Sequence, residues 1–267
     1  MMNSNGSAGE DTPLLSSTPN RKPHRLGSRW HQHLAAKVSR NWADCVLILC
    51  YLITGLLDSA SISVWGSFVS MQTGNTVYLG LGLAEPDAST RWIKSGVSLL
   101  AFCVGSFLFS RFHRRFSPKR RWVLAASFTA QAALTTIAAG LVTSAGPPTN
   151  PQDVGWPVLV PIALVAFQSC GQAVVSRALD YNTLTSVVLT SIYCDLFSDA
   201  ELFKLRNVER NRRTGAPLCL LLGAFVGGQF ADSSWGVAGA LWAASILKAG
   251  VVVVWLLWPA EESGEES

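Results

Sequence analysis

Long apolar segments separated by short polar connections dominate residues 44–258. Several of them, such as 92–110, 122–142 and 235–258, reach the roughly 20 residues that a helix needs to cross a bilayer. A soluble helical core would instead need amphipathic helices with a charged face, and these runs have almost none. The pattern therefore predicts an all-α, polytopic membrane protein. Its apolar segments are 44–65, 66–83, 92–110, 122–142, 157–177, 183–203, 216–231 and 235–258.

Two of these segments contain a polar interruption, one in each half of the chain. The first, residues 70–75, reads Ser-Met-Gln-Thr-Gly-Asn, and the second, residues 182–191, is rich in Thr and Ser. Lipid offers no partner to a free N–H or C=O, so a broken helix at membrane depth must be sheltered by protein or line a wet cavity. Interrupted segments at matching places in two halves point to the binding site of a secondary transporter.

The distribution of Lys and Arg predicts how many times the chain crosses. The segment before residue 44 and the connection 111–121 carry six each, 204–213 carries five, and 143–156 carries none. Short Lys/Arg-rich connections stay in the cytosol. With all three basic segments cytosolic, 44–83 and 157–203 each make one net crossing, which gives six crossings and cytosolic termini. Eight full spans remain an alternative, and whether 66–83 and 183–203 span fully or re-enter stays open.

The chain also contains a weak internal repeat. Gly55 and Gly171 lie 116 residues apart, and Thr73 and Thr190 lie 117 apart. With three crossings in each half, the second half would be inverted relative to the first, a common transporter architecture. We therefore expect one transmembrane domain, 44–258, built from repeats 44–142 and 157–258.

The two ends of the chain are predicted to lie outside this domain. Residues 1–43 have little to bury and predict a disordered cytosolic tail, and 259–267 form an acidic C-terminal tail. Glu10 precedes the pair Leu14 and Leu15 in the pattern of a dileucine sorting signal. This signal predicts trafficking adaptors as partners and a vacuolar or endosomal membrane, with the plasma membrane as the alternative. A chance match is the competing explanation.

Composition narrows the function classes. Of the 267 residues, 14% are charged, against roughly 25% in a soluble domain, and the net charge is +4. The cations lie in blocks beside the apolar runs, so we expect lipid as a partner and no nucleic acid. The six cysteines show no zinc spacing, and no nucleophile elbow, phosphate loop or HExxH is present. We therefore expect no enzyme activity, cofactor or metal; a homo-oligomer is left open.

Paired motifs resemble a known family. Residues 55–60 read Gly-Leu-Leu-Asp-Ser-Ala and 68–75 read Phe-Val-Ser-Met-Gln-Thr-Gly-Asn. Residues 167–173 read Phe-Gln-Ser-Cys-Gly-Gln-Ala, followed by Arg177 and a Thr-rich run at 185–191. These elements are similar to the signatures of the YoaK-like membrane proteins, domain of unknown function 1275. The resemblance implies about six spans and carries no biochemical function. Gln72 interrupts the family's Met-Thr-Gly-Asn run, and Ser191 with Ile192 replaces a second Gly-Asn.

In the first half, the candidate site consists of Asp58, Thr73, Gly74 and Asn75. An acidic side chain inside a membrane span is costly and marks a functional site by default, so Asp58 is a candidate for proton or ion coupling. A carboxylate that only holds the broken segment in place is the alternative. Gly74 would allow a positive φ at the break, and Asn75 would cap the half-helix that follows.

In the second half, the candidates are Gln168, Gln172, Arg177 and Thr190. The two glutamines lie one helical turn apart on one face, where they would bind a solute or join helices. Arg177 would pair with Asp180 or Asp58, or extend to the headgroups.

Together these features predict a secondary transporter or permease for a small solute, proton-coupled through Asp58. The rival prediction is a non-transporting scaffold or assembly factor, in which the polar breaks pack tightly without a cavity.

Overall fold

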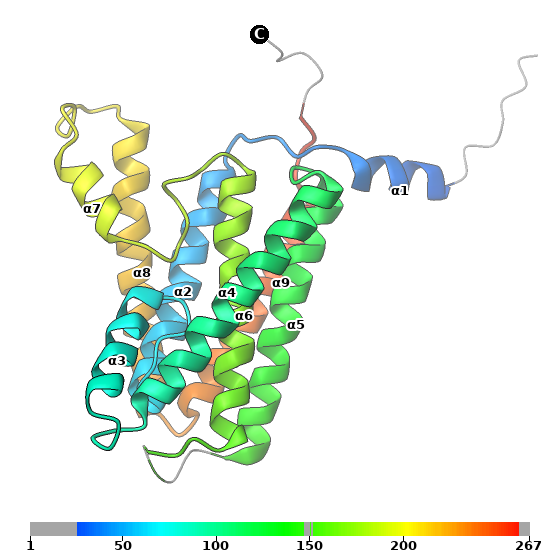
Figure 1. Ribbon diagram of the computed structural model, residues 1–267. Helices are drawn as coiled ribbons and strands as arrows, with labels where there is room; N and C mark the ends of the chain where they lie inside the picture. The colour runs from blue at the N-terminus through cyan, green and yellow to red at the C-terminus, as the bar shows by residue number, and fades with distance from the viewer. Residues whose placement is uncertain (1–25, 147–149, 151, 262–267) are drawn as a thin grey trace, which may run out of the picture.

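The structure, a computed structural model, describes residues 26–146, 150 and 152–261 (Figure 1). The described part of the chain is helical: α1 (Leu26–Ala35), α2 (Ala43–Trp65), α3 (Gln72–Ala84), α4 (Arg91–Phe116), α5 (Arg121–Ala145), α6 (Trp156–Ala178), α7 (Thr190–Phe197), α8 (Val208–Asp232) and α9 (Gly236–Leu257).

Six of these helices, α2, α4, α5, α6, α8 and α9, are long and apolar enough to cross a bilayer. The two remaining apolar segments form only the 13-residue α3 and the 8-residue α7. These helices are about 20 and 12 Å long, which is too short to span a bilayer. The protein is thus an integral membrane protein, and the prediction of a polytopic helical bundle with six spans and two short segments is confirmed.

Both short helices follow a loop that turns back into the bundle. In Figure 1, α2 descends from the upper end, residues 66–71 rise again, and α3 descends from near the middle of the bundle to the lower end. After α6 ascends, residues 179–189 dip back into the upper half, and α7 rises from there. The two breaks therefore enter the bundle from opposite ends.

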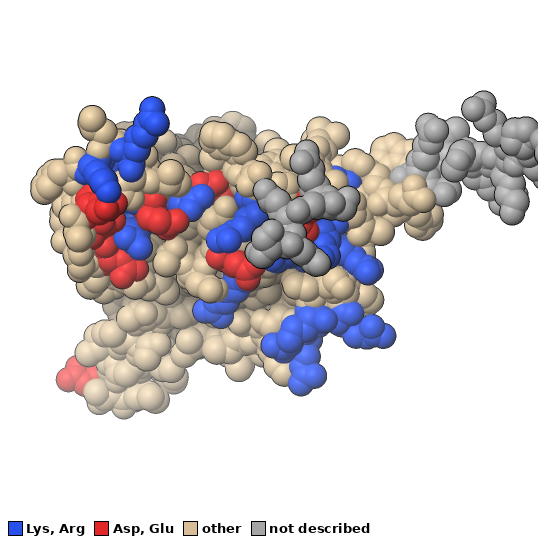
Figure 2. Space-filling view, turned by 90° about the horizontal axis from the view of Figure 1, so that it is seen from above, with Lys and Arg blue, Asp and Glu red and all other residues tan. Residues whose placement is uncertain are grey.

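Charged residues gather at the upper end of the bundle, where α2 begins and α9 finishes. Figure 2 looks down on this end and shows many Lys and Arg side chains together with several Asp and Glu. Arg212 of α8 pairs there with Asp44 of α2 at 2.7 Å. We call this the charged end.

Glycines bring two pairs of helices into close contact. An added Cβ on Gly223 or Gly227 of α8 would overlap the carbonyls of Leu52 or Leu56 in α2, and one on Gly105 of α4 would overlap the carbonyl of Phe167 in α6. Small residues at such crossings let two backbones approach closely in lipid. As a result α2 and α6 form the buried centre, while α4 and α8 present most of their surface outward.

The segment preceding the first span contains more structure than the sequence predicted. Residues 26–35 form α1, and Val38 is buried against the C-terminal segment. Ser39 N–H donates to Pro259 C=O at 3.0 Å, and Glu261 N–H donates to Lys37 C=O at 2.9 Å. Backbone pairing across the chain therefore orders this segment, which a composition argument cannot detect.

Two helices extend beyond their apolar stretches into the basic connections. α4 continues to Phe116, and α8 begins at Val208, where the Asn207 side chain accepts a hydrogen bond from the N–H of Arg210 at 2.9 Å. Lys and Arg are good helix formers, so the helix continues after hydrophobicity stops.

Candidate functional site

The first break is held to α2 by Asp58. One carboxylate oxygen of Asp58 accepts hydrogen bonds from the backbone N–H groups of Val69 and Ser70, both at 2.8 Å. The carboxylate is buried and forms no ion pair with any described residue. Its charge is instead stabilised by loop amides, as in other buried carboxylates that accept several N–H bonds.

Asn75 binds the same loop from the other side. Its side-chain oxygen accepts from Phe68 N–H at 3.1 Å and its nitrogen donates to Phe68 C=O at 2.7 Å. The Ser98 hydroxyl of α4 also donates to Phe68 C=O at 2.7 Å. These bonds satisfy a peptide group that has no helical partner, which lipid could not do.

The expected roles of Asn75 and Gly74 are different in the structure. α3 begins at Gln72, so Asn75 lies inside the helix and does not cap it. Gly74 has no positive φ; an added Cβ would lie 2.7 Å from the Phe68 ring, so the glycine makes room for that ring. Thr73 points outward and is exposed.

The second break folds differently. Asp180 and Ser186 have positive φ values of 61° and 62°. Asp180 pairs with Lys119 at 2.7 Å, and this hydrogen bond lowers the pKa of the Asp180 carboxyl below its usual value. The Tyr51 hydroxyl of α2 donates a hydrogen bond to Thr183 C=O of this loop at 3.4 Å. Non-glycine residues with positive φ carry strain that surrounding contacts must offset, and such residues often lie at functional sites.

Both loops contact the same turn of α6. Ser169 donates from its hydroxyl to Val69 C=O in the first loop at 2.9 Å. The Ser186 hydroxyl of the second loop lies 3.3 Å from the amide of Gln172. α6 therefore connects the two breaks within one helical turn.

Next to this turn lies a set of buried polar side chains that we call the central cluster: Lys248, Gln131, Gln168, Gln172, Thr54 and Ser186. Lys248 of α9 donates to the Gln131 amide oxygen of α5 at 2.8 Å. In the amide orientation that satisfies both of its ends, Gln172 accepts from Lys248 Nζ at 3.0 Å and donates to Cys50 C=O at 3.3 Å. Thr54 lies 3.4 Å from the same amide.

The cluster lies deep in the bundle. Lys248 is nine residues from the end of α9, roughly 14 Å along its axis, too far for its side chain to reach the headgroups easily. Its side chain is fully buried.

Two amides of the cluster are incompletely hydrogen-bonded. Gln131 Nε2 and both terminal atoms of Gln168 are buried and have no hydrogen-bond partner among the described residues. A buried polar group left without a partner costs about 1–3 kcal/mol. Gly171 permits the position of Gln131, since an added Cβ there would lie 2.6 Å from Gln131 Nε2.

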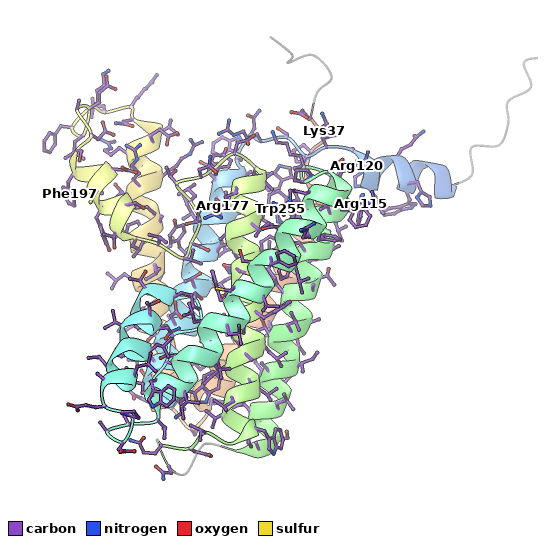
Figure 3. All side chains as sticks on the ribbon, in the orientation of Figure 1. Lys37, Arg115, Arg120, Arg177, Phe197 and Trp255 are labelled. Atoms are coloured by element: carbon purple, nitrogen blue, oxygen red, sulfur yellow. The ribbon has the colours of Figure 1, made fainter. Side chains whose placement is uncertain are left out.

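Arg177 and Thr190 lie away from this cluster. Arg177 is exposed at the charged end of α6 (Figure 3), and neither Asp58 nor Asp180 forms an ion pair with it. Asp180 pairs with Lys119 instead, so neither of the two ion pairs expected for Arg177 is present, and its extension to the headgroups stays a prediction. Thr190 is exposed at the start of α7, and Ser186 rather than Thr190 reaches the cluster.

Clefts in the described structure lie elsewhere. One of about 590 Å³ lies at the end opposite the charged one, between α2, α5 and α9, and is lined by Val64, Val142 and Trp242 among others. Two apolar clefts lie on the outer side of α4, α5 and α6. None of the three is lined by Asp58, Asn75 or Lys248. The side chains of the central cluster are themselves buried from solvent in this structure.

A family model described as "Protein of unknown function (DUF1275)" matches residues 46–254, nearly the whole bundle. The chain belongs to this family. The predicted family is thereby confirmed. No curated protein and no solved structure matches the chain. The DUF1275 assignment brings no reaction or substrate with it, so function has to be argued from the geometry.

Sequence reasoning selected Asp58, Gln168 and Gln172 but left out Gln131 and Ser186. For Lys248 a usable signal existed, because a cation in the middle of a span is itself a functional candidate. Gln131 and Ser186 carried no comparable signal: an isolated Gln or Ser in an apolar helix or loop is common, and only the packing shows what it faces.

The two sorting-signal leucines, Leu14 and Leu15, and Glu10 lie outside the described residues. Adaptor binding stays a prediction.

Proposed function

We propose that this DUF1275 protein is a secondary transporter for a small solute, with the central cluster as its binding site. The observation that carries the proposal is the convergence of both loops on one turn of α6, where Ser169 and Ser186 make their contacts. The first loop enters from the end opposite the charged one and the second from the charged end. Each loop therefore separates the cluster from one side, as the gates of an alternating-access transporter must.

An inverted repeat belongs to this proposal, and the helix packing supports it. In the two repeats α2 corresponds to α6 and α4 corresponds to α8. The pair α2–α8 is therefore equivalent to the pair α6–α4, and glycines lie at the contact in both pairs. Gln131 and Lys248 lie 117 residues apart, the same separation as Thr73 and Thr190, and they contact each other. Equivalent positions of two repeats meet in this way only on the axis that relates them.

We assign proton coupling to Asp58. Its carboxylate holds the first loop through two backbone N–H groups. A proton on this carboxylate removes the negative charge that makes it a strong acceptor, which weakens its hold on the loop. Protonation would thus favour opening from that side.

The transport proposal is tested in two steps. An untargeted metabolite comparison of deletion and wild-type cells selects candidate solutes, and purified protein in sealed vesicles is then assayed for their uptake under an imposed pH gradient. We expect gradient-driven accumulation of at least one solute. Vesicles that take up none of the selected solutes faster than protein-free vesicles would contradict transport.

The coupling role is tested with Asp58→Asn, which keeps an acceptor oxygen for the loop but carries no charge. We expect this variant to lose gradient-driven uptake while it still exchanges solute at equilibrium. Gradient-driven uptake equal to that of the wild type would remove Asp58 from the coupling mechanism.

A scaffold or assembly factor is the second candidate. The observation in its favour is that Asp58 and Asn75 use their hydrogen bonds on the loop backbone. Absence of flux together with co-purification of a stoichiometric membrane partner would favour this reading.

A further inference from the structure

The central cluster contains a full positive charge without a negative neighbour. Lys248 is completely buried, and the ion pairs among the described residues do not include it. Its two polar contacts are neutral amide oxygens, from Gln131 and Gln172. A buried charge is ordinarily paired with an opposite one, because neutral dipoles alone compensate it poorly.

The unpartnered groups around Lys248 include spare donors. The ammonium has three N–H groups, of which one donates to Gln131 and, in the orientation of the Gln172 amide that satisfies both of its ends, a second donates to Gln172. Gln131 Nε2 is a buried donor without an acceptor, and its own oxygen is bound to Lys248. Gln168 Nε2, one turn before Gln172 on α6, is another. The site thus has surplus hydrogen-bond donors and one uncompensated positive charge.

We propose that the central cluster binds one small monovalent anion, of the size and chemistry of a short carboxylate. The anion would accept hydrogen bonds from Lys248, Gln131 and Gln168 and supply the missing negative charge. A single charge fits because Lys248 is the only cation in the cluster. Gly171 makes room for the Gln131 amide against α6, which brings its unpartnered Nε2 donor into the cluster. The identification of this anion as the transported solute rests on the function proposed above; the binding itself does not.

Thermal unfolding of the purified full-length protein in detergent tests binding. The probes are sodium formate, sodium acetate and sodium sulfate at one ionic strength, with glycerol as a neutral control. We expect formate or acetate to raise the melting temperature in a saturable way, and sulfate and glycerol to give no saturable shift. Failure of both formate and acetate to stabilise the wild type would overturn the proposal.

Variants assign the binding to the cluster. Lys248→Met should abolish the saturable shift, while Lys204→Met, which removes an exposed cation at the charged end, should leave it intact. Gln168→Met is the sharper variant because Gln168 makes no hydrogen bond in the described structure, so its loss should not unfold the protein. We expect Gln168→Met to bind the anion at least tenfold more weakly. If the melting temperatures of both cluster variants rise with the anion as much as that of the wild type, the anion binds elsewhere and the proposal is contradicted.

Vesicle flux separates this inference from the transport proposal. Saturable anion binding without flux would leave the site standing and remove the transporter. Flux of a neutral or cationic solute that is unchanged in Gln168→Met would leave the transporter standing and show that the anion is not its solute.

Discussion

At the residue scale, Asn75 takes the place of a missing neighbouring peptide. Its amide group presents one acceptor and one donor to the N–H and C=O of Phe68, as a paired strand would. This pairing lets an extended loop exist inside a helical bundle where lipid cannot solvate it. The sequence drew attention to the right residue, and only the fold shows what it binds.

Replacing Asn75 by Ala should therefore destabilise the protein. The substitution leaves the buried Phe68 peptide with fewer partners, which should cost about 1–3 kcal/mol and lower the melting temperature measurably. Thr73→Ala is the matched control, because Thr73 lies on the same helix and is exposed. Equal melting temperatures for the two variants would show that the Asn75 bonds do not hold the loop.

Replacing two buried polar residues of the site should have opposite effects on the stability of the protein. One oxygen of Asp58 accepts two hydrogen bonds from loop amides, whereas neither terminal atom of Gln168 has a partner among the described residues. Removing the polar group from Gln168 should thus be neutral or stabilising, while removing the Asp58 oxygens should not be. Melting curves of Gln168→Met and Asp58→Ala test this contrast; a larger loss in the glutamine variant would contradict it.

At the element scale, the pair α2–α8 depends on backbone contact. Gly223→Ala would place a methyl group against the Leu52 carbonyl, where no flexible side chain can yield. The two helices must then separate, with a destabilisation of roughly 1–3 kcal/mol.

The matched control is Gly140→Ala in α5, where an added Cβ meets no atom within 4 Å. A helical glycine with free space gains up to about 1 kcal/mol on replacement by alanine. Chemical or thermal unfolding should therefore separate the two variants in opposite directions, and a harmless Gly223→Ala would disprove tight packing of α2 on α8.

The sequence predicted the elements well and their ends less well. Hydropathy located eight apolar segments that include all six spans, and charge counting predicted one net crossing for each of 44–83 and 157–203, while it left open whether 66–83 and 183–203 span fully. Neither pattern predicted that α8 begins at Val208, because basic residues continue a helix without adding hydrophobicity. Nor could it place Ser186 beside Gln172, a contact set by a loop conformation with positive φ.

At the scale of the whole molecule, the charged end predicts the orientation in the membrane. The basic connections after α4 and before α8 lie at this end, together with the start of α2 and the end of α9. From the positive-inside tendency we expect this end to face the cytosol. The connection between α5 and α6, residues 146–155, would then face the other side.

Engineered N-glycosylation sites test this orientation in a eukaryotic cell. An acceptor sequence inserted between Gly146 and Gly155 should be modified, and one appended after residue 261 should remain unmodified, as a mobility shift on gels shows. The reverse pattern would contradict this orientation and show that both predicted tails lie outside the cytosol.

The backbone junction between residues 37–39 and 259–261 links the segment that follows α1 to the segment that follows α9. Arg121 reinforces it by donating to the carbonyls of His33 and Trp258. Damage at one of these segments is thus transmitted to the other: trimming the chain back to Trp258 would remove the backbone hydrogen bonds that residues 37 and 39 form with residues 261 and 259, although the two segments lie more than two hundred positions apart in the sequence.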